Sequence, residues 1–131
     1  MNADFVSFSL AKKLKEKGFR KPCVATYDKD GMLGYNYIQH YIQPASIRAI
    51  GFDDCLCISD ALVLAPTISQ VLKWLREEKK LHIIIPASYY ECYWWEVRDF
   101  NREISEYSDN EFDSYENAAI AVVEYIIDNL I

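Results

Sequence analysis

Residues 114–131 read SYENAAIAVVEYIIDNLI, and this stretch predicts a long helix with a broad apolar face. The apolar residues recur at the helical period and are Ala118, Ala119, Val122, Val123, Ile126, Ile127 and Leu130. This face is wider than the seam of a coiled coil, so the helix should cover a sheet or lie between two layers. Asp113 and Glu116 fit a capping box at its start. A helix from about Ser114 to Ile131 is therefore expected to anchor the core.

Two more helices are predicted upstream. Ser7 has the side chain of an N-cap, and Gly18 is a stop signal, which gives a helix over residues 8–17. Its inward positions are Leu10, Ala11 and Leu14. Thr67 and Gln70 fit a capping box that opens a helix to about Lys79. The expected apolar stripe of that helix is Ile68, Val71, Leu72 and Leu75.

Strands are predicted in two groups. The turn residues Asp28–Gly31 separate Cys23–Tyr27 from Leu33–Tyr37, which indicates a hairpin. The second group is a meander of three strands, His82–Ile85, Cys92–Asp99 and Glu103–Tyr107. Each group follows a helix, so the chain has two helix-strand-strand units.

Residues 38–64 follow neither the helical nor the strand period for long, and Pro44 and Gly51 interrupt them. We expect a long excursion there, with short strands at Ile47–Ile50 and Leu56–Ile58. The predicted fold class is α+β, a mainly antiparallel sheet with three helices packed on it. The 131 residues suit a single domain over residues 1–131.

Composition predicts a globular cytoplasmic protein. Hydrophobic residues make up 51% of the chain and charged residues 26%. No apolar run approaches the roughly 18 residues that span a bilayer, and residues 1–4 do not begin a secretion signal. The four cysteines are too few and too scattered for a disulfide framework, which fits reduced thiols in a cytosol.

Charge is distributed unevenly along the chain. The net charge is −6, with 14 basic and 20 acidic residues, so nucleic acid is not an expected partner. Six basic residues and one acid lie between Lys12 and Lys21, whereas eight acids and no base follow Arg102. Each end either solvates its own helix face or attracts the other end, within one chain or between chains.

The order of the helix-opening segments resembles a known group of proteins. Val6–Phe8 opens a helix that ends at Gly18, Ala65–Thr67 opens the helix that carries Trp74–Glu77, and Ser114–Ala118 opens the last one. This order is similar to that in a loose group of small uncharacterised bacterial proteins, common in Bacteroides-type genomes and often encoded in prophage or mobile elements. The resemblance implies an intracellular α+β fold and a mobile-element origin, and it brings no site residues with it.

Aromatic residues are densest in Tyr89–Trp95, which leads into a predicted strand. In a regular strand Tyr93, Trp95 and Val97 share the face toward the helices. Trp94, Glu96 and Arg98 then share the opposite face. The predicted ligand-binding or partner-binding residues are Tyr90, Trp94 and Arg98. The alternative is that residues 38–64 cover Trp94.

Metal and cofactor motifs are weak. Cys55 and Cys57 form one close pair without the second pair that structural zinc requires. Asp109, Glu111 and Asp113 alternate like the start of a calcium loop, but the glycine and the final glutamate are missing at the required offsets. The glycines form no phosphate-binding loop. We therefore predict neither a metal nor a cofactor.

The function predicted from these residues is a non-catalytic binding or protein-interaction module, with a protein partner or a second copy of the chain as its target. The alternative is a small enzyme whose site assembles only in three dimensions. Its candidate polar groups are His40, Cys55, Cys57, Asp60 and His82. A pocket that joins a histidine to a thiol or a carboxylate would favour catalysis.

Overall fold

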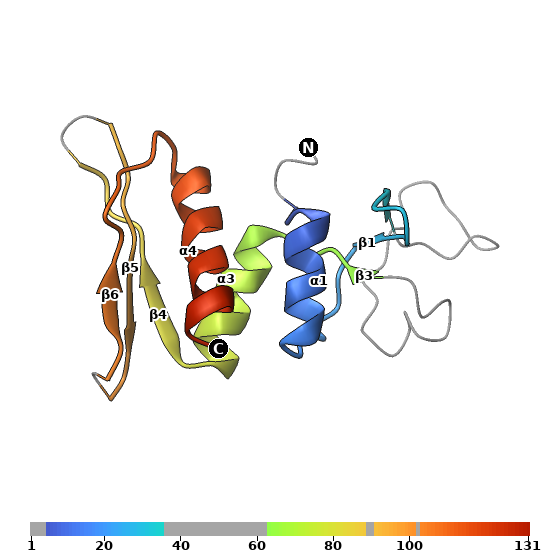
Figure 1. Cartoon of the computed structure of the whole chain (residues 1–131), viewed down its shortest axis with the longest axis horizontal. Coiled ribbons are helices and arrows are strands. Elements are labelled where there is room, and N and C mark those ends of the chain that lie inside the picture. The colour runs from blue at the N-terminus through green and yellow to red at the C-terminus, as the bar shows by residue number, and fades with distance from the viewer. Residues whose placement is uncertain (1–4, 36–62, 89–90, 102) are drawn as a thin grey trace. The chain divides into compact units, whose positions relative to one another are not determined.

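The computed structural model describes residues 5–35, 63–88, 91–101 and 103–131. The chain divides into two compact units, Met1–Thr67 and Ile68–Ile131 (Figure 1). The single domain expected over residues 1–131 stays a prediction. The strands predicted at Ile47–Ile50 and Leu56–Ile58 lie outside the described residues.

The first unit pairs one helix with a small sheet. Its elements are α1 (Phe8–Glu16), β1 (Ala25–Tyr27), β2 (Leu33–Tyr35) and β3 (Val63–Leu64). The sheet has the order β2-β1-β3, and both pairings are antiparallel. The predicted hairpin is confirmed, because β1 and β2 flank a turn in which the Asp28 carboxylate accepts hydrogen bonds from the Asp30 and Met32 amides.

Helix α1 begins where its cap predicts. The Ser7 hydroxyl accepts a hydrogen bond from the Leu10 amide at 3.2 Å, which satisfies one free donor of the first turn. Leu10 and Leu14 are buried, as predicted, together with Ala11. The helix ends at Glu16, one residue earlier than predicted, and Gly18 follows with a φ of +89°, a conformation that glycine adopts without strain.

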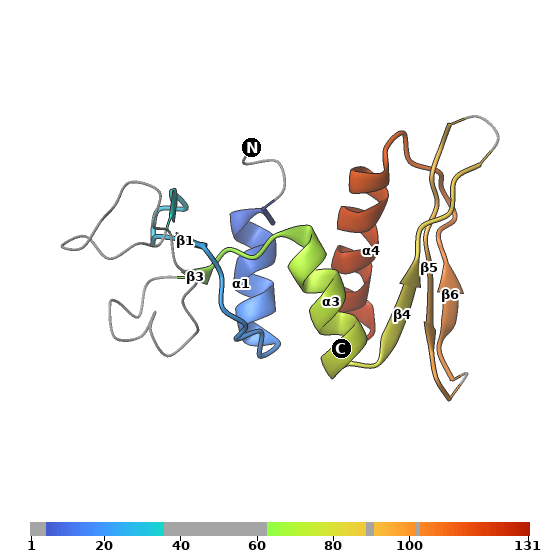
Figure 2. The same ribbon diagram turned by 180° about the vertical axis from the view of Figure 1, so that it is seen from behind.

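The second unit carries two helices on one face of a second sheet. Its elements are α3 (Ile68–Glu78), β4 (Leu81–Ile84), β5 (Glu96–Asp99), β6 (Ser105–Tyr107) and α4 (Tyr115–Asn129). The strands form an antiparallel sheet in the order β4-β5-β6. Figures 1 and 2 show α3 and α4 on the same side of this sheet.

Aromatic contacts hold α4 against the sheet. The rings of Trp95 and Tyr125 lie 4.9 Å apart between centroids, and the Tyr125 hydroxyl donates a hydrogen bond to the Glu106 carboxylate. Val97 is fully buried on the same side. The helix side of the sheet therefore belongs to the core.

The predicted apolar face of α4 is confirmed, but its predicted cap is wrong. Six of the seven predicted positions are buried, and Leu130 is half-buried. The Ser114 hydroxyl, not Asp113, accepts the hydrogen bond from the Asn117 amide. Ser114 has the extended backbone conformation of an N-cap. Asp113, one residue earlier, accepts a hydrogen bond from the Asn117 side chain instead.

The α+β class is confirmed, with three helices and antiparallel strands in the described part of the chain. The strands form two sheets of three, and some are shorter than predicted. Regular pairing in β5 starts at Glu96 rather than Cys92, since Tyr93 makes only isolated bridges to Ala87 and Phe112. Strand β6 starts at Ser105 rather than Glu103.

Two local features of the second unit were also not predicted. The Asp99 side chain bonds the Ile104 amide and shapes the loop before β6. Trp74 is buried on α3 although the predicted stripe omitted it.

No described helix is long and apolar enough to cross a membrane.

Candidate interaction surface

The sheet of the second unit has a face turned away from its helices, which we call the outer face. Directly paired residues of antiparallel strands point to the same side, so the register defines this face. One cross-strand row joins His82, Arg98 and Ser105, and the next joins Ile84, Glu96 and Tyr107. The outer face consists of these six residues.

Trp94 continues the outer face, as the predicted alternation requires. Its neighbours point the other way, because Tyr93 contacts Tyr115 and Trp95 contacts Tyr125, both on α4. The Trp94 amide donates to the Pro86 carbonyl, which places these two residues side by side. Tyr93, Trp95 and Val97 therefore face the helices as predicted, and the half-buried Trp94 lies opposite.

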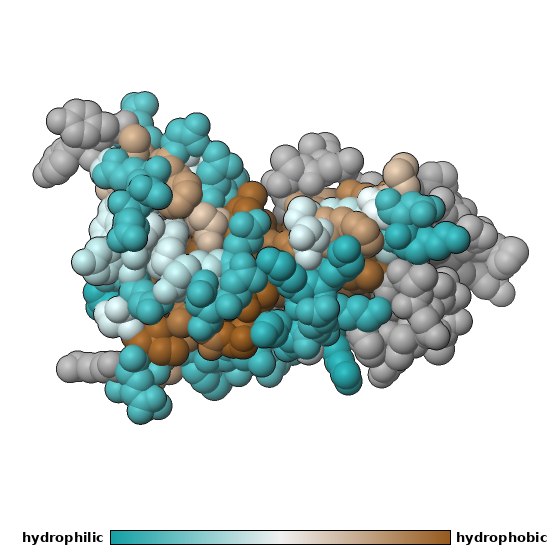
Figure 3. Space-filling model, in the orientation of Figure 1, coloured by the Kyte–Doolittle hydropathy of each residue, from teal (hydrophilic) through white to brown (hydrophobic). Residues whose placement is uncertain are grey.

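Large apolar side chains are exposed on and beside the outer face. Ile84 is 43% exposed and Tyr107 66%. Phe100, directly after β5, is also 66% exposed and packs edge-on against the His82 ring at 4.4 Å between centroids. Figure 3, which views the sheet from its edge, shows hydrophobic residues at the surface among hydrophilic ones on another side of the molecule. Exposed apolar groups gathered on one face are typical of binding surfaces.

An ion pair occupies the middle of the outer face. Nη2 of Arg98 donates to Oε1 of Glu96 at 2.7 Å, with side chains 56% and 17% exposed. Trp94 and Arg98 are four residues apart in an extended chain, which separates them by about 13 Å. Their joint role in binding stays a prediction, and Glu96, which lies between them, holds the guanidinium. Tyr90, the third predicted binding residue, lies outside the described residues.

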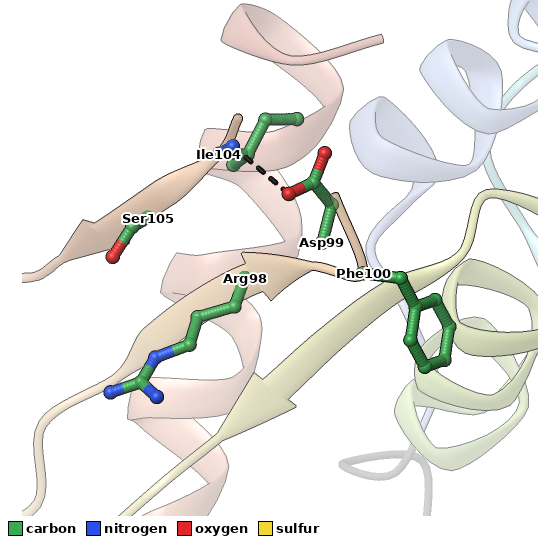
Figure 4. Close-up of a pocket in the computed structure, with 5 residues that line it drawn as sticks. All are labelled: Arg98, Asp99, Phe100, Ile104 and Ser105. Atoms are coloured by element: carbon green, nitrogen blue, oxygen red, sulfur yellow. Dashed lines mark hydrogen bonds between the residues drawn. The ribbon is translucent and has the colours of Figure 1, made fainter. Parts of the chain in front are cut away.

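An open pocket of about 390 Å³ lies where β5 ends and β6 begins (Figure 4). It is lined by Arg98, Asp99, Phe100, Ile104 and Ser105. Figure 4 shows the Asp99 carboxylate turned to the Ile104 amide, at 3.0 Å, and the Arg98 side chain extending away from Phe100. Both charged residues of the pocket are thus engaged within the protein.

His82 and Ser105 stand on either side of Arg98 in one row. They are two strands apart, about 10 Å, which is too far for a hydrogen bond between a base and a nucleophile. Nε2 of His82 is buried and has no hydrogen-bond partner in the structure. The other polar groups proposed for an enzyme, His40, Cys55, Cys57 and Asp60, lie outside the described residues.

The described residues contain no group of three His, Cys, Asp or Glu side chains arranged to hold a metal ion. Asp109, Glu111 and Asp113 are exposed in the loop before α4. Cys23 is buried, with its Sγ donating to the Lys21 carbonyl at 3.2 Å, and Cys92 is half-buried. Cys55 and Cys57, the close pair that was weighed against a zinc site, lie outside the described residues.

Sequence reasoning did not include Ile84, Phe100 or Tyr107 in the site. Ile84 and Tyr107 were placed in predicted strands, and alternation puts each on one face of its own strand. The strand register that joins them through Glu96 cannot be read from the sequence, because it depends on pairing between distant segments.

No family model, no curated protein and no solved structure matches this chain. The resemblance to small bacterial proteins therefore stays a prediction.

Proposed function

We propose that this chain is a non-catalytic protein-interaction module that binds its partner through the outer face of β4, β5 and β6. The observation that carries the proposal is the exposure of Ile84 and Tyr107 on both sides of the Arg98–Glu96 ion pair. The few residues that dominate the binding energy of protein interfaces are enriched in tyrosine and tryptophan. Trp94 and Arg98 stay in the proposed binding site, as does Tyr90.

The engaged charges on this face favour binding over catalysis. A catalytic site needs a base beside the group that it activates. His82 packs against Phe100, and Arg98 is bound to Glu96. A cytoplasmic location is part of the same proposal, because four scattered cysteines are too few for the disulfide framework of a secreted domain.

Selection from a random twelve-residue peptide library against the full chain tests the proposal. We expect peptides that bind the wild-type protein and bind the Tyr107→Ser variant at least roughly tenfold more weakly, because an exposed aromatic contact is lost. The matched control is Met32→Ser, since Met32 is 68% exposed but belongs to the first unit.

The control variant should bind the selected peptides as the wild type does. If every selected peptide binds wild type, Tyr107→Ser and an Ile84→Ser variant equally, the outer face is not the binding site. Far-UV circular dichroism of each variant checks that the substitution at an exposed position leaves the fold intact.

A further inference from the structure

We propose that the outer face binds a short basic segment of another protein, one that carries arginine or lysine beside an apolar side chain. This inference rests on the proposed function and specifies the chemistry of the partner. Charge, exposed aromatic rings and the small area of the face each favour such an occupant.

The charge of the second unit is the first argument. From Leu81 to Ile131, which includes the sheet and α4, the sequence has two basic and eleven acidic residues, a formal charge of −9. Most of these acids, including Glu103 and Glu111, are exposed. A field of this sign attracts basic partners and raises their association rate. It repels acidic partners, including a second copy of this chain, whose net charge is −6.

The exposed aromatic rings are the second argument. Tyr107 and Phe100 offer exposed rings on or beside a surface with a carboxylate at its centre. Lysine and arginine bind both groups, since a cation is attracted by the ring face and by the carboxylate. The protein uses the same contact internally, where Nζ of Lys12 lies 4.5 Å from the Phe8 ring centroid.

The area of the outer face is the third argument. Three strands spaced about 4.8 Å apart, each about 13 Å long, give a flat area of roughly 200 Å². A stable protein–protein interface buries about 800 Å² on each partner. The face by itself therefore suits a few residues of an extended segment, and a stable dimer of this chain would need surface beyond it.

Glu96 and Arg98 provide a test of the partner's sign. In the free protein Arg98 neutralises the Glu96 carboxylate. A basic segment would offer its own cation to Glu96 in competition with Arg98. Each of the substitutions Glu96→Gln and Arg98→Gln breaks the same ion pair, but they change the local charge in opposite directions. A basic segment should bind Glu96→Gln more weakly and Arg98→Gln more tightly.

The experiment uses the full chain and two twelve-residue peptide libraries of equal size. One library allows only arginine or lysine at alternate positions, the other only aspartate or glutamate, and the remaining positions are random in both. We expect peptides whose binding depends on Tyr107 to come from the basic library in at least about tenfold excess. Their affinity should fall severalfold between 50 and 500 mM NaCl, as salt screens exposed charges.

The strongest basic peptide is then measured against the charge variants. We expect a severalfold loss for Glu96→Gln and a gain for Arg98→Gln. The exposed Lys73–Glu77 pair on α3 supplies the matched controls Glu77→Gln and Lys73→Gln, which change the net charge equally at a site away from the outer face. These controls should change the affinity much less.

The possible failures are distinguishable. Peptides that depend on Tyr107 but come from the acidic library would overturn the basic partner and leave the interaction module standing. An absence of any peptide that depends on Tyr107 would overturn the proposed function itself. Equal effects of Glu77→Gln and Glu96→Gln would show attraction by overall charge without docking at the outer face. Self-association in light scattering that Tyr107→Ser abolishes would make a second copy the occupant.

Discussion

Gly31 joins the two halves of the first hairpin in a conformation that suits glycine alone. Its φ is +83°, and a Cβ atom there would lie 2.9 Å from Cδ2 of Phe8. Asp28 organises the same turn through its carboxylate. The positive φ and the closeness of the Phe8 ring thus both favour glycine at this position of the turn.

We predict that Gly31→Ala lowers the free energy of unfolding by about 1–2 kcal/mol, since alanine is strained at positive φ and its methyl group would press on Phe8. Gly34→Ala is the control, because nothing lies within 4 Å of a Cβ at Gly34. Urea unfolding followed by circular dichroism measures both. Equal losses for the two variants would contradict the role assigned to Gly31.

Tyr125 links α4 to β6 through its hydroxyl. The hydrogen bond to Glu106 raises the pKa of Tyr125 above its ordinary value of 10.0, and burial and the negative charges of Glu106 and Asp109 raise it further. The folded protein therefore holds this proton more tightly than the unfolded chain does. The resulting stability is fully present below pH 10 and is lost as the pH rises through the folded-state pKa.

We predict that the free energy of unfolding falls less steeply above pH 10 in Tyr125→Phe than in the wild type. Urea titrations at a series of pH values from 8 upward measure the difference. Tyr27, whose pKa burial also raises, is common to both proteins and cancels in the comparison. Parallel pH profiles would mean that the Tyr125–Glu106 bond does not couple to folding.

At the scale of elements, the helices could be predicted because their signals are local. Ser7 and Leu10 lie three residues apart, and the helical period of the last stretch names the buried residues of α4. The cap of α4 was misplaced by one residue because Asp113 and Ser114 both have capping side chains. Strand β3 was missed because two residues carry no period, and its pairing with β1 depends on a distant segment.

Only part of the outer face could be predicted, because alternation is a local signal whereas the pairing of strands depends on distant segments. Alternation along one strand predicts that Trp95 faces the helices, which its contact with Tyr125 confirms, and that Trp94 and Arg98 share the opposite face, which stays a prediction. Ile84 and Tyr107 join them only through the register of three strands. The ion pair between Arg98 and Glu96 could not be predicted from the sequence, because each charged side chain could also have paired with a residue on a neighbouring strand.

The cap of α4 makes a prediction at this scale. Ser114→Ala should lower the free energy of unfolding by about 1 kcal/mol, because the Asn117 amide loses its acceptor. Asp113→Ala should cost less than half as much, since it removes only an exposed bond to the Asn117 side chain. Urea unfolding of both variants decides between the caps, and a larger loss for Asp113→Ala would restore the cap predicted from the sequence.

At the scale of the whole molecule, charge distinguishes the two units. Residues 1–67 carry eight basic and seven acidic residues, a formal charge of +1, whereas residues 68–131 carry six and thirteen, a formal charge of −7. The exposed aromatic and apolar side chains of the outer face belong to the acidic unit. Charge and exposed apolar side chains therefore both favour the second unit as the binding site of the proposed basic partner.

Chemical-shift mapping of the full, ¹⁵N-labelled chain with the strongest selected peptide tests the central claim most directly. If the peptide binds the outer face, the largest changes in amide chemical shift should fall in β4, β5 and β6, at Ile84, Glu96, Arg98 and Tyr107. Tyr107→Ser should remove them, and Met32→Ser should not. Shifts concentrated instead in α1, β1 and β2, with the amides of β4, β5 and β6 unchanged, would contradict the account.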